Sequence, residues 1–423
     1  MSIFALIDCH CFYVSCERLF RPELRGKPVV SLSNNDGCVV SRSDEAKRLN
    51  IKMGQPYFQI EHLIRQSGLI CCSSNYGLYQ DISNRVMEII RRNVPSQELY
   101  SIDESWADLS GVPDPEAFAR MLQGEILRLT GIPVGIGIAQ TKTLAKIANW
   151  ASKRWKMQTG AVVDLRCVEK QRKLLMYADV DEVWGIGRQI SKKLGYFNIN
   201  KAWDLAEFDK KTLRKAFSVN IERTSRELSG EKCLDLVTDL EPKKMIACTR
   251  SFGERVTSLA SLREAISSFV SRAAVKLRQQ HQYACCIQVF IQTSRFDESG
   301  MPYARSATVS LSNPTCDTRD FLNAAMTALN QIYREGPRYA KAGIILSQFF
   351  DAGTFTDDLF STPRRKHSEK LMAVLDAINT REGRGTVRFA SEPYTPSWSM
   401  KRSLLSPNYT TDWNQVMRII IDQ

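Results

Sequence analysis

A short apolar run at residues 3–7, which ends directly on the carboxylate of Asp8, restricts the fold of this chain more than any other feature. A run of this length is typical of a buried strand. Strand-like runs and segments of helical spacing then alternate as far as about residue 165. Because such alternation builds a sheet covered by helices, we expect an α/β domain in this part of the chain.

The elements expected in that domain are short and closely spaced. Strands are predicted at residues 3–7, 28–32, 38–41, 99–109 and 134–138, and helices at 12–20, 44–49 and from about Thr141. Asp36 and Gly37 lie between two of these strands. An Asp-Gly pair supplies the positive φ angles of a tight turn, so it predicts a hairpin there.

The second half of the chain carries a different pattern. Its elements follow the order strand, helix, strand, strand, helix, strand, at residues 246–256, 262–279, 284–293, 307–312, 321–334 and 342–350. This split β-α-β order predicts a separate α+β domain. Residues 166–230 read as short helices with Gly- and Lys-rich turns, residues 234–245 as a linker, and the chain beyond about 352 as a less regular tail.

Charge and cysteine content limit the class of protein. A net charge of +12 and a pI near 9.1 favour a polyanionic partner, with a merely soluble basic protein as the alternative. No span approaches the roughly 18 apolar residues of a membrane helix, and the apolar N-terminus lacks the basic leader of a signal peptide. Twelve scattered cysteines, no Cys-x-x-Cys and only four histidines argue against zinc and indicate free thiols in a reducing cytoplasm.

Three carboxylates stand where buried strands are expected. Asp8 closes one strand, and Asp103 and Glu104 are adjacent at the centre of another strand region. Charged groups are rarely buried without partners, and a few hard oxygen ligands suit Mg²⁺. Two such ions can activate an attacking 3′-hydroxyl and stabilise a leaving pyrophosphate. Surface carboxylates at the tip of a hairpin are the alternative interpretation.

Three segments together resemble a known family. The opening motif comprises Asp8, Phe12, Tyr13, Ser15 and Glu17, the second acidic motif is residues 101–104, and a third motif covers residues 135–148. They resemble, in family order, the motifs of the Y-family, or translesion, DNA polymerases over about residues 1–350. Residues 33–40, 171–173, 183–188, 381–386 and 400–410 look like the UmuC group, the catalytic subunits of bacterial DNA polymerase V and their plasmid-borne relatives.

The resemblance implies both a fold and an activity. The expected fold is a right-hand polymerase with a palm (residues 1–12 and 78–165), fingers (13–77), a helical thumb with a helix-hairpin-helix (166–233), a linker (234–245), a β-α-β-β-α-β little finger (246–351) and a C-terminal partner-binding tail (352–423). The implied activity is error-prone translesion synthesis, in which dNTPs are added to a primer end opposite damaged bases during SOS-type repair and mutagenesis. The implied location is the bacterial cytoplasm, at the nucleoid.

The resemblance also assigns the metal site. Asp8, Asp103 and Glu104 match the ligands of two Mg²⁺ ions, and the main-chain carbonyl of Cys9 matches a further ligand. Tyr13 matches the residue that stacks under the incoming sugar and excludes a 2′-hydroxyl. The position of Tyr13, about one helical turn beyond Asp8, fits that role, and an ordinary core aromatic is the alternative.

Two lysines match residues that hold the triphosphate. Lys47 corresponds to a basic residue of the fingers and Lys153 to one of the palm, although each also fits a solvated helix face. Asp44 stands three positions before Lys47, where some relatives carry tyrosine. Because an acidic group is a poor phosphate ligand, we expect the tyrosine contact to be absent.

Residues 142–227 hold most of the excess positive charge. They contain 19 Lys and Arg against 10 Asp and Glu, a net of +9. Gly185 and Gly187, followed by Lys192 and Lys193, form a helix-hairpin-helix signature in which main-chain N–H groups approach a phosphate. A simple helix C-cap is the alternative. In the little finger, Arg250, Arg255 and Arg305 are candidates for backbone contacts.

The tail predicts partners for the polymerase. In related chains a Gln-Leu-x-Leu-Phe segment binds the sliding clamp, but here the corresponding stretch at 356–360 lacks the Gln and carries two acids, so clamp binding is in doubt. The family resemblance implies a processed UmuD dimer (UmuD′) and the RecA filament as partners. A packed extension without a partner is the alternative. The surface expected to bind them contains Trp398, Lys401, Arg402, Tyr409 and Trp413.

Two other functions share some of these features. A two-metal nuclease would use the same carboxylates but would need neither Tyr13 nor the triphosphate lysines, and primer extension with dNTPs separates the two. A non-catalytic DNA-binding partner of the same fold is the second alternative, and the intact Asp8, Asp103 and Glu104 argue against it.

Overall fold

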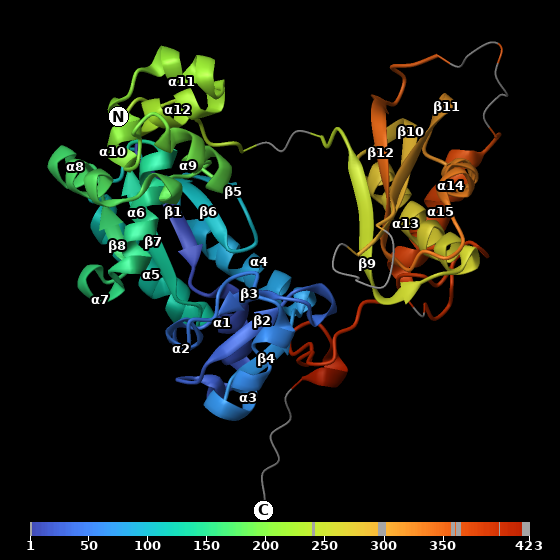
Figure 1. Cartoon of the computed structure of the whole chain (residues 1–423), viewed down its shortest axis with the longest axis horizontal. Helices are drawn as coiled ribbons and strands as arrows, with labels where there is room; N and C mark the ends of the chain where they lie inside the picture. Colours follow the sequence, from blue (N-terminus) through green and yellow to red (C-terminus); the bar gives the residue numbers. More distant parts are fainter. Residues whose placement is uncertain are drawn as a thin grey trace, which may run out of the picture. The chain divides into compact units, whose positions relative to one another are not determined.

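The computed structural model describes residues 2–238, 242–294, 302–356, 360, 365–396 and 398–416. It contains two compact units (Figure 1). Unit 1 comprises Met1–Ser33, Gly37–Leu240 and Leu404–Gln423, and unit 2 comprises Asn34–Asp36 and Glu241–Ser403. Most of unit 2 is therefore inserted into the sequence of unit 1, and unit 1 resumes at Leu404.

A five-stranded sheet forms the centre of unit 1. Its order is β5 (Ser96–Leu99), β6 (Glu104–Asp108), β1 (Phe4–Cys9), β7 (Val134–Ala139), β8 (Val162–Asp164). β1 is antiparallel to both neighbours and all six of its residues are buried. The strands expected at 3–7 and 134–138 are confirmed.

Successive residues of β1 face opposite layers of helices, because side chains alternate across a strand. Ala5 and Ile7 belong to the core formed with α4 (Tyr76–Asn93) and α5 (Pro115–Thr130). Phe4 and Leu6 belong to the core formed with α6 (Lys142–Arg154). Asp8 is in phase with Phe4 and Leu6, so its side chain lies on the α6 face of the sheet.

The expected strand region 99–109 is corrected to two strands joined by a turn. Strand β5 ends at Leu99 and β6 begins at Glu104, so Asp103 lies in the turn and is only half-buried. The Ser101 hydroxyl accepts hydrogen bonds from the N–H groups of Asp103 (3.3 Å) and Glu104 (3.0 Å), which closes the turn. The carboxylates thus stand at a hairpin end rather than in the middle of a buried strand pair.

A second, three-stranded sheet in unit 1 has the order β3 (Val39–Arg42), β2 (Val29–Leu32), β4 (Ile70–Ser73). The expected β2–β3 hairpin is confirmed, but its turn differs. The positive φ angles belong to Asn35 (59°) and Asp36 (50°), whereas Gly37 has a φ of −78°. The connection is longer than a two-residue turn, and its two left-handed residues lie one position closer to the N-terminus than the Asp-Gly pair predicted. The helices beside this sheet are α1 (Phe12–Phe20), α2 (Asp44–Arg48) and α3 (His62–Ser67).

Short helices complete unit 1. They are α7 (Lys156–Thr159), α8 (Val168–Tyr177), α9 (Arg188–Gly195), α10 (Ala202–Glu207), α11 (Lys210–Ala216) and α12 (Val219–Leu228). The buried apolar residues of α8 to α12 share one core with α6, whereas the only apolar residue of α7, Met157, is exposed. Within the described part of the predicted linker, residues 234–238 and 242–245 form no helix or strand.

Unit 2 has the predicted β-α-β-β-α-β order. Its sheet runs β11 (Ala304–Thr315), β10 (Gln282–Thr293), β12 (Tyr339–Asp351), β9 (Ile246–Val256), with α13 (Leu259–Gln279) and α14 (Thr318–Ile332) packed against one face (Figure 1). The expected split arrangement is confirmed. Residues 34–36 are part of this unit through Asn35, whose amide donates to the carbonyls of Ser251 (3.1 Å) and Phe252 (3.2 Å).

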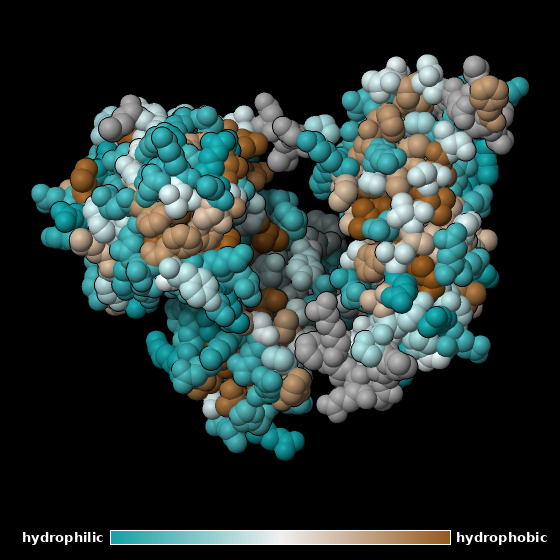
Figure 2. Space-filling model, turned by 45° about the horizontal axis from the view of Figure 1, so that its top comes forward, coloured by the Kyte–Doolittle hydropathy of each residue, from teal (hydrophilic) through white to brown (hydrophobic). Residues whose placement is uncertain are grey.

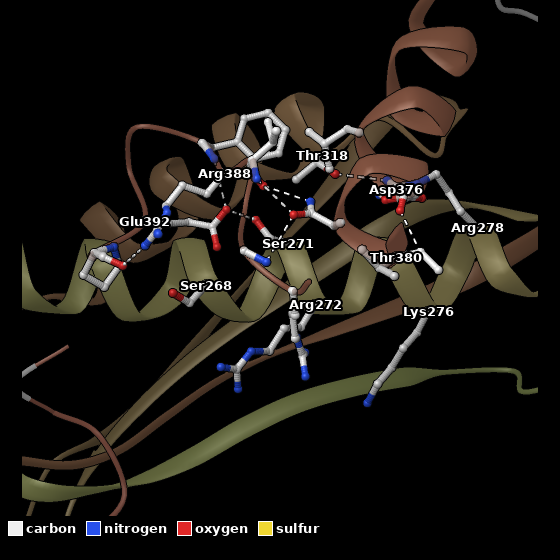
Figure 3. Close-up of a pocket in the computed structure, with 18 of the residues that line it drawn as sticks. Ser268, Ser271, Arg272, Lys276, Arg278, Thr318, Asp376, Thr380, Arg388 and Glu392 are labelled. Atoms are coloured by element: carbon white, nitrogen blue, oxygen red, sulfur yellow. Dashed lines mark hydrogen bonds and ion pairs between the residues drawn. The ribbon is translucent and has the colours of Figure 1, made fainter. Parts of the chain in front are cut away.

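The tail contains a helix that the sequence pattern did not indicate. Helix α15 (Ser368–Arg381) buries a single residue, Met372, so it lacks the apolar stripe by which a helix is recognised. It is held instead by polar contacts with α13, where Arg278 pairs with Asp376 through two hydrogen bonds of 2.7 and 2.8 Å. A cavity of about 680 Å³ lies between α13 and the tail. Figure 3 shows Arg278 and Asp376 among the residues that line it.

All twelve cysteines fall within the described residues, and all are free thiols. On the face shown in Figure 2, hydrophilic residues predominate and hydrophobic residues form scattered patches. None of the described helices combines the length and the apolar character needed to cross a membrane.

Gly137 sets the distance between β7 and α6, and this leads to a stability prediction. A Cβ atom at this position would collide with the α6 backbone at Ala145 and Asn149. We expect Gly137→Ala to lower the free energy of unfolding by about 3 kcal/mol, as overpacking does in rigid cores. Urea unfolding followed by circular dichroism measures this change.

The matched control is Gly124→Ala. Gly124 lies within α5 with no atom near its missing Cβ, so alanine should stabilise the helix by about 0.5–1 kcal/mol. Equal effects of the two substitutions would contradict the close approach of α6 to β7.

Candidate active site

The three predicted acidic residues lie at one corner of the central sheet. Asp8 and Glu104 are direct partners in the antiparallel register of β1 and β6. The Cys9 N–H donates to the Asp103 carbonyl over 2.8 Å, which ties the turn to the end of β1. Asp103 is held locally, because its carboxylate accepts a 2.6 Å hydrogen bond from the Ser101 hydroxyl.

Two lysines of α6 neutralise this corner. Lys153 Nζ lies 2.6 Å from Asp8 Oδ2, and Lys146 Nζ lies 3.0 Å from both carboxylate oxygens of Glu104. The two lysines are seven residues apart, which places them on one face of the helix. Lys146 also lies over the ring of Tyr100, 4.7 Å from its centroid. Lys146 belongs to a motif recognised in the sequence, but nothing in that motif indicated its partner.

Burial and pairing shift the pKa values of Asp8 and Glu104 in opposite directions. Burial raises the pKa of Asp8 to about 7, even though the charge of Lys153 opposes the shift, and the hydrogen bond with Glu104 raises it further. Burial alone would also raise the pKa of Glu104, but the hydrogen bond from Asp8 and the charge of Lys146 outweigh it and hold that pKa below its usual range. With a pKa of about 7, Asp8 is partly protonated near neutral pH, and a cation that binds here competes with its proton.

The donor chemistry fits Mg²⁺, although the donors are not gathered into a cage. Among the described residues, no group of three or more His, Cys, Asp or Glu side chains is arranged to hold a metal ion. The available donors are carboxylate oxygens and main-chain carbonyls, which are the hard ligands that Mg²⁺ prefers. The ammonium groups of Lys153 and Lys146 lie beside the carboxylates of Asp8 and Glu104.

Tyr13 lies in an aromatic cluster beside the acidic corner. Strand β1 passes directly into α1 through Cys11, which has a left-handed backbone (φ 46°, ψ 47°) and places Tyr13 within one turn of the strand end. Its ring stacks on Tyr79, with centroids 4.5 Å apart and an interplanar angle of 17°, and meets the edge of Tyr76. The ring is half-buried, so it is supported by the core while keeping an exposed part.

Positive charge gathers near the start of α1. Lys47 pairs with Asp44 over 2.6 Å, so this aspartate neutralises the lysine expected to hold phosphate. Burial, together with the charges of Lys156 and other lysines, lowers the pKa of His10 to about 4. Lys156, which had not been singled out from the sequence, thus belongs to this basic surface with Lys47 and Lys153.

The glycine-rich turn before α9 has an open backbone. Gly185 has a φ of 88° and Gly187 is the N-cap of α9, with no atom within 4 Å of its missing Cβ. Lys192 and Lys193 are exposed on α9. The adjacent Trp184 donates through its indole N–H to the Tyr100 hydroxyl over 3.2 Å, which connects this turn to the hairpin that bears Asp103.

The expected partner-binding surface of the tail is partly buried. Trp398 is only 5% exposed and packs against Phe252 and Phe269, so it is a core residue of unit 2. Tyr409 stacks on Phe20 with centroids 4.6 Å apart. Lys401, Arg402 and Trp413 are exposed. In the expected clamp segment, residues 357–359 lie outside the described part of the chain.

Comparisons with known proteins agree with this architecture. Residues 7–150 match the impB/mucB/samB family and residues 243–359 its C-terminal domain, while residues 369–419 match a domain of unknown function, DUF4113. The chain is 49% identical to protein UmuC of Salmonella typhimurium, over 99% of this chain and 100% of that one. It is 45% identical to protein ImpB of Salmonella typhimurium and 42% to protein MucB of Escherichia coli, each over 98% of this chain and 99% of the relative.

Solved structures share the fold. A chimera of the Y-family DNA polymerases Dbh and Dpo4 superposes with a TM-score of 0.64 at 20% identity, covering 82% of this chain and 99% of the other. An insertion ternary complex of Dbh DNA polymerase gives a TM-score of 0.53 at 20% identity, over 82% of this chain and 99% of that one. The fold is thus that of a Y-family DNA polymerase.

The sequence identity to these relatives extends over nearly the whole chain, so it shows the family as well as the fold. The chain belongs to the impB/mucB/samB family, the UmuC group of the Y-family polymerases. It is a DNA-directed DNA polymerase of the error-prone translesion class that acts in SOS mutagenesis.

The raised pKa of Asp8 predicts a pH dependence of stability in the absence of metal. The folded chain binds this proton more tightly than the unfolded chain, in which the pKa is near 3.8. The contribution to stability is therefore complete below pH 3.8 and is lost as the pH rises to about 7. Over that interval the free energy of unfolding of the native chain should fall, relative to Asp8→Asn, by up to about 4 kcal/mol.

Urea unfolding in EDTA at a series of pH values measures this difference. Asp8→Asn is nearly isosteric and cannot titrate, so it serves as the reference for all other groups. Parallel stability curves for the two proteins would show that Asp8 keeps an ordinary pKa.

Proposed function

We propose that the acidic corner of β1 and β6 is the nucleotidyl-transfer site and that it adds dNTPs to a primer end opposite damaged template bases. The observation that supports this most strongly is the direct pairing of Asp8 with Glu104, whose carboxylates bind Lys153 and Lys146 of α6. Carboxylates that can bind cations therefore lie within 3.0 Å of ammonium groups that can bind phosphates.

Asp8, Asp103 and Glu104, with the Cys9 carbonyl, would hold two Mg²⁺ ions. When bound, these ions supply activation of the primer 3′-hydroxyl and stabilisation of the departing pyrophosphate. The low pKa of Glu104 keeps that carboxylate charged. Lys153 neutralises Asp8 in the absence of a ligand, and it would turn to the triphosphate when Asp8 is engaged.

The basic surface around His10 would bind the triphosphate. Lys153 and Lys47 are the proposed contacts, and Lys156 adds charge beside them. Lys47 is 43% exposed at its side chain and shares its charge with Asp44, so its contribution should be weaker than that of Lys153.

The primer-template would be gripped away from this corner through phosphate contacts. The proposed contacts are the N–H groups near Gly185 and Gly187, with Lys192 and Lys193 on α9. By this assignment residues 1–12 and 78–165 form the palm, 13–77 the fingers, 166–233 the thumb and 246–351 the little finger. Each of these roles is supported by one part of the fold: the palm by the central sheet, the fingers by the β2–β3–β4 sheet, the thumb by the short helices and the little finger by the split β-α-β fold.

The proposed partners beyond DNA follow from the family. They are a UmuD′-type dimer and the RecA filament, which the exposed Lys401, Arg402 and Trp413 suit as docking residues. Free thiols support the proposed bacterial cytoplasmic location. Clamp binding through residues 356–360 is not part of this proposal.

Asp103→Asn tests the assignment of the metal ligands. The substitution removes one charge from a half-buried turn without disturbing the main-chain bond between Cys9 and Asp103. Nucleotide addition should fall by at least about a hundredfold, because catalysis by positioned metal ions depends on ligand charge. Primer extension over an abasic template measures activity, and fluorescence anisotropy with primer-template DNA should show nearly unchanged binding. Near-normal extension would exclude Asp103 from the site.

Tyr13→Ala tests the choice of sugar. A rigid ring under C2′ leaves no room for a hydroxyl, which discriminates by exclusion rather than by added attraction. Its removal should raise ribonucleotide incorporation at least tenfold relative to deoxynucleotide incorporation, while much of the latter remains. Single-nucleotide kinetics with matched dNTPs and rNTPs gives the ratio. A proportional loss of both activities would make Tyr13 a core residue only.

A further inference from the structure

The C-terminal segment 404–411 is joined to the end of β4, at the edge of the β2–β3–β4 sheet, by a single bridge and does not itself form a strand. Ser73, at the end of β4, donates its N–H to the Leu404 carbonyl over 2.9 Å, and the Leu404 N–H donates to the Ser73 hydroxyl over 2.9 Å. Ser73 and Leu405 form a parallel bridge. Tyr409 then stacks on Phe20 of α1. We call this segment the C-terminal strap.

The strap is bonded to the residue from which α4 starts. The amide of Asn75 donates to the Ser406 carbonyl (3.1 Å), the Ser406 hydroxyl (3.2 Å) and the Pro407 carbonyl (3.2 Å). The other atom of the same amide, Oδ1, accepts from the Leu78 N–H and caps α4. One buried side chain thus joins the strap to the first turn of the helix that carries Tyr76 and Tyr79.

A buried carboxylate connects the strap to that helix a second time. Glu17 is fully buried, and its Oε1 accepts hydrogen bonds from the Tyr79 hydroxyl (2.7 Å) and the Ser406 hydroxyl (3.0 Å). Its second oxygen has no hydrogen-bond partner within the described residues. Burial raises the pKa of Glu17, and the two hydroxyl groups pull it back. A carboxylate with so few donors depends strongly on each of them.

This connection ends at the ring of Tyr13. Tyr13 and Glu17 are one turn apart on α1, and Tyr79 contacts both, because its hydroxyl bonds Glu17 while its ring stacks on Tyr13 at 4.5 Å. A change at the Ser406–Glu17 contact therefore moves the hydroxyl of the same residue whose ring supports Tyr13. Glu17 belongs to the opening motif and Ser406 to the tail motif, and neither has a role in the proposed chemistry.

We propose that Ser406, Glu17 and Tyr79 are positioning residues that hold the Tyr13 ring in place, so that the C-terminal strap determines how strictly the polymerase selects its sugar. The proposal rests on the proposed role of Tyr13. None of the three residues contacts a reacting atom. Ser406 acts through Glu17, Glu17 through the Tyr79 hydroxyl, and Tyr79 through its stacked ring. The strap thereby carries a specificity function in the part of the chain that matches the domain of unknown function.

Ser406→Ala is the principal test. It removes one donor from Glu17 and should raise the ratio of ribonucleotide to deoxynucleotide kcat/KM by roughly threefold to tenfold, which corresponds to the loss of one hydrogen bond to a buried carboxylate. The deoxynucleotide rate itself should change by less than about twofold, since no reacting group is touched. Tyr79→Phe keeps the stacked ring but removes the hydroxyl, so it should shift the ratio in the same direction. Ser406→Thr keeps a hydroxyl and should restore the native ratio.

Ser73→Ala is the matched control. It is also a buried serine that holds the strap, through the Leu404 N–H, but it has no bond to Glu17. The ratio should stay at the native value, and thermal unfolding should show similar small losses for Ser73→Ala and Ser406→Ala. An equal shift of the ratio in both variants would overturn the proposal, because it would show that docking of the strap in general, rather than Glu17, matters. An unchanged ratio in Ser406→Ala and Tyr79→Phe would overturn it as well.

The failure of this inference can be told apart from the failure of the proposed function. If Tyr13→Ala raises ribonucleotide use and Ser406→Ala does not, Tyr13 selects the sugar without help from the strap. If Tyr13→Ala itself leaves the ratio unchanged, sugar selection lies elsewhere, and both proposals are overturned.

Discussion

The antiparallel pairing of β1 with β6 is the interaction on which the candidate site depends. It sets Asp8 opposite Glu104 and joins Cys9 to the turn that bears Asp103. Because β1 is the central strand and is buried along its whole length, Asp8 cannot turn away into solvent, and its charge must be met by a neighbour. Lys153 of α6 meets it, at a distance that follows from the absence of a side chain on Gly137. The packing that stabilises the sheet thus also determines the electrostatics of the site.

Local patterns in the sequence predicted the elements that alternate regularly, and they failed where contacts over long sequence distances decide the structure. The apolar run before Asp8, the helix after Thr141 and the split β-α-β order were all readable, because burial on one face leaves a periodic trace. The turn at 100–103 was missed because a serine hydroxyl, rather than Gly or Pro, closes it. Helix α15 was missed because an ion pair with Arg278 holds it where an apolar stripe would be expected.

At the candidate site, too, local sequence patterns indicated some of the residues, whereas contacts over long sequence distances determined the rest. Asp8, Asp103 and Glu104 could be singled out because carboxylates beside apolar strand-like runs are unusual; Asp8 and Glu104 are cross-strand partners, whereas Asp103 lies in the turn before β6. Their lysine partners could not be chosen from among the many lysines of a basic chain, since pairing depends on which face of α6 meets the sheet. Tyr13 was placed near the site by its spacing from Asp8, but the stack on Tyr79 joins residues 66 positions apart in the sequence, and no local pattern reports it.

The position of the C-terminal strap bears on how truncated forms of such polymerases are interpreted. Strand β4 is the outer strand of its sheet, and the strap covers the end of its free edge at Ser73. An uncovered edge presents unpaired N–H and C=O groups that can recruit strands from other molecules. A chain shortened before residue 404 would therefore uncover the Ser73 end of this edge, where strands of other molecules could pair, at the same time as it lost Trp413. Weakened partner binding in such a fragment would reflect aggregation as readily as a missing contact, so point substitutions on the exposed side of the tail are the cleaner way to locate a partner.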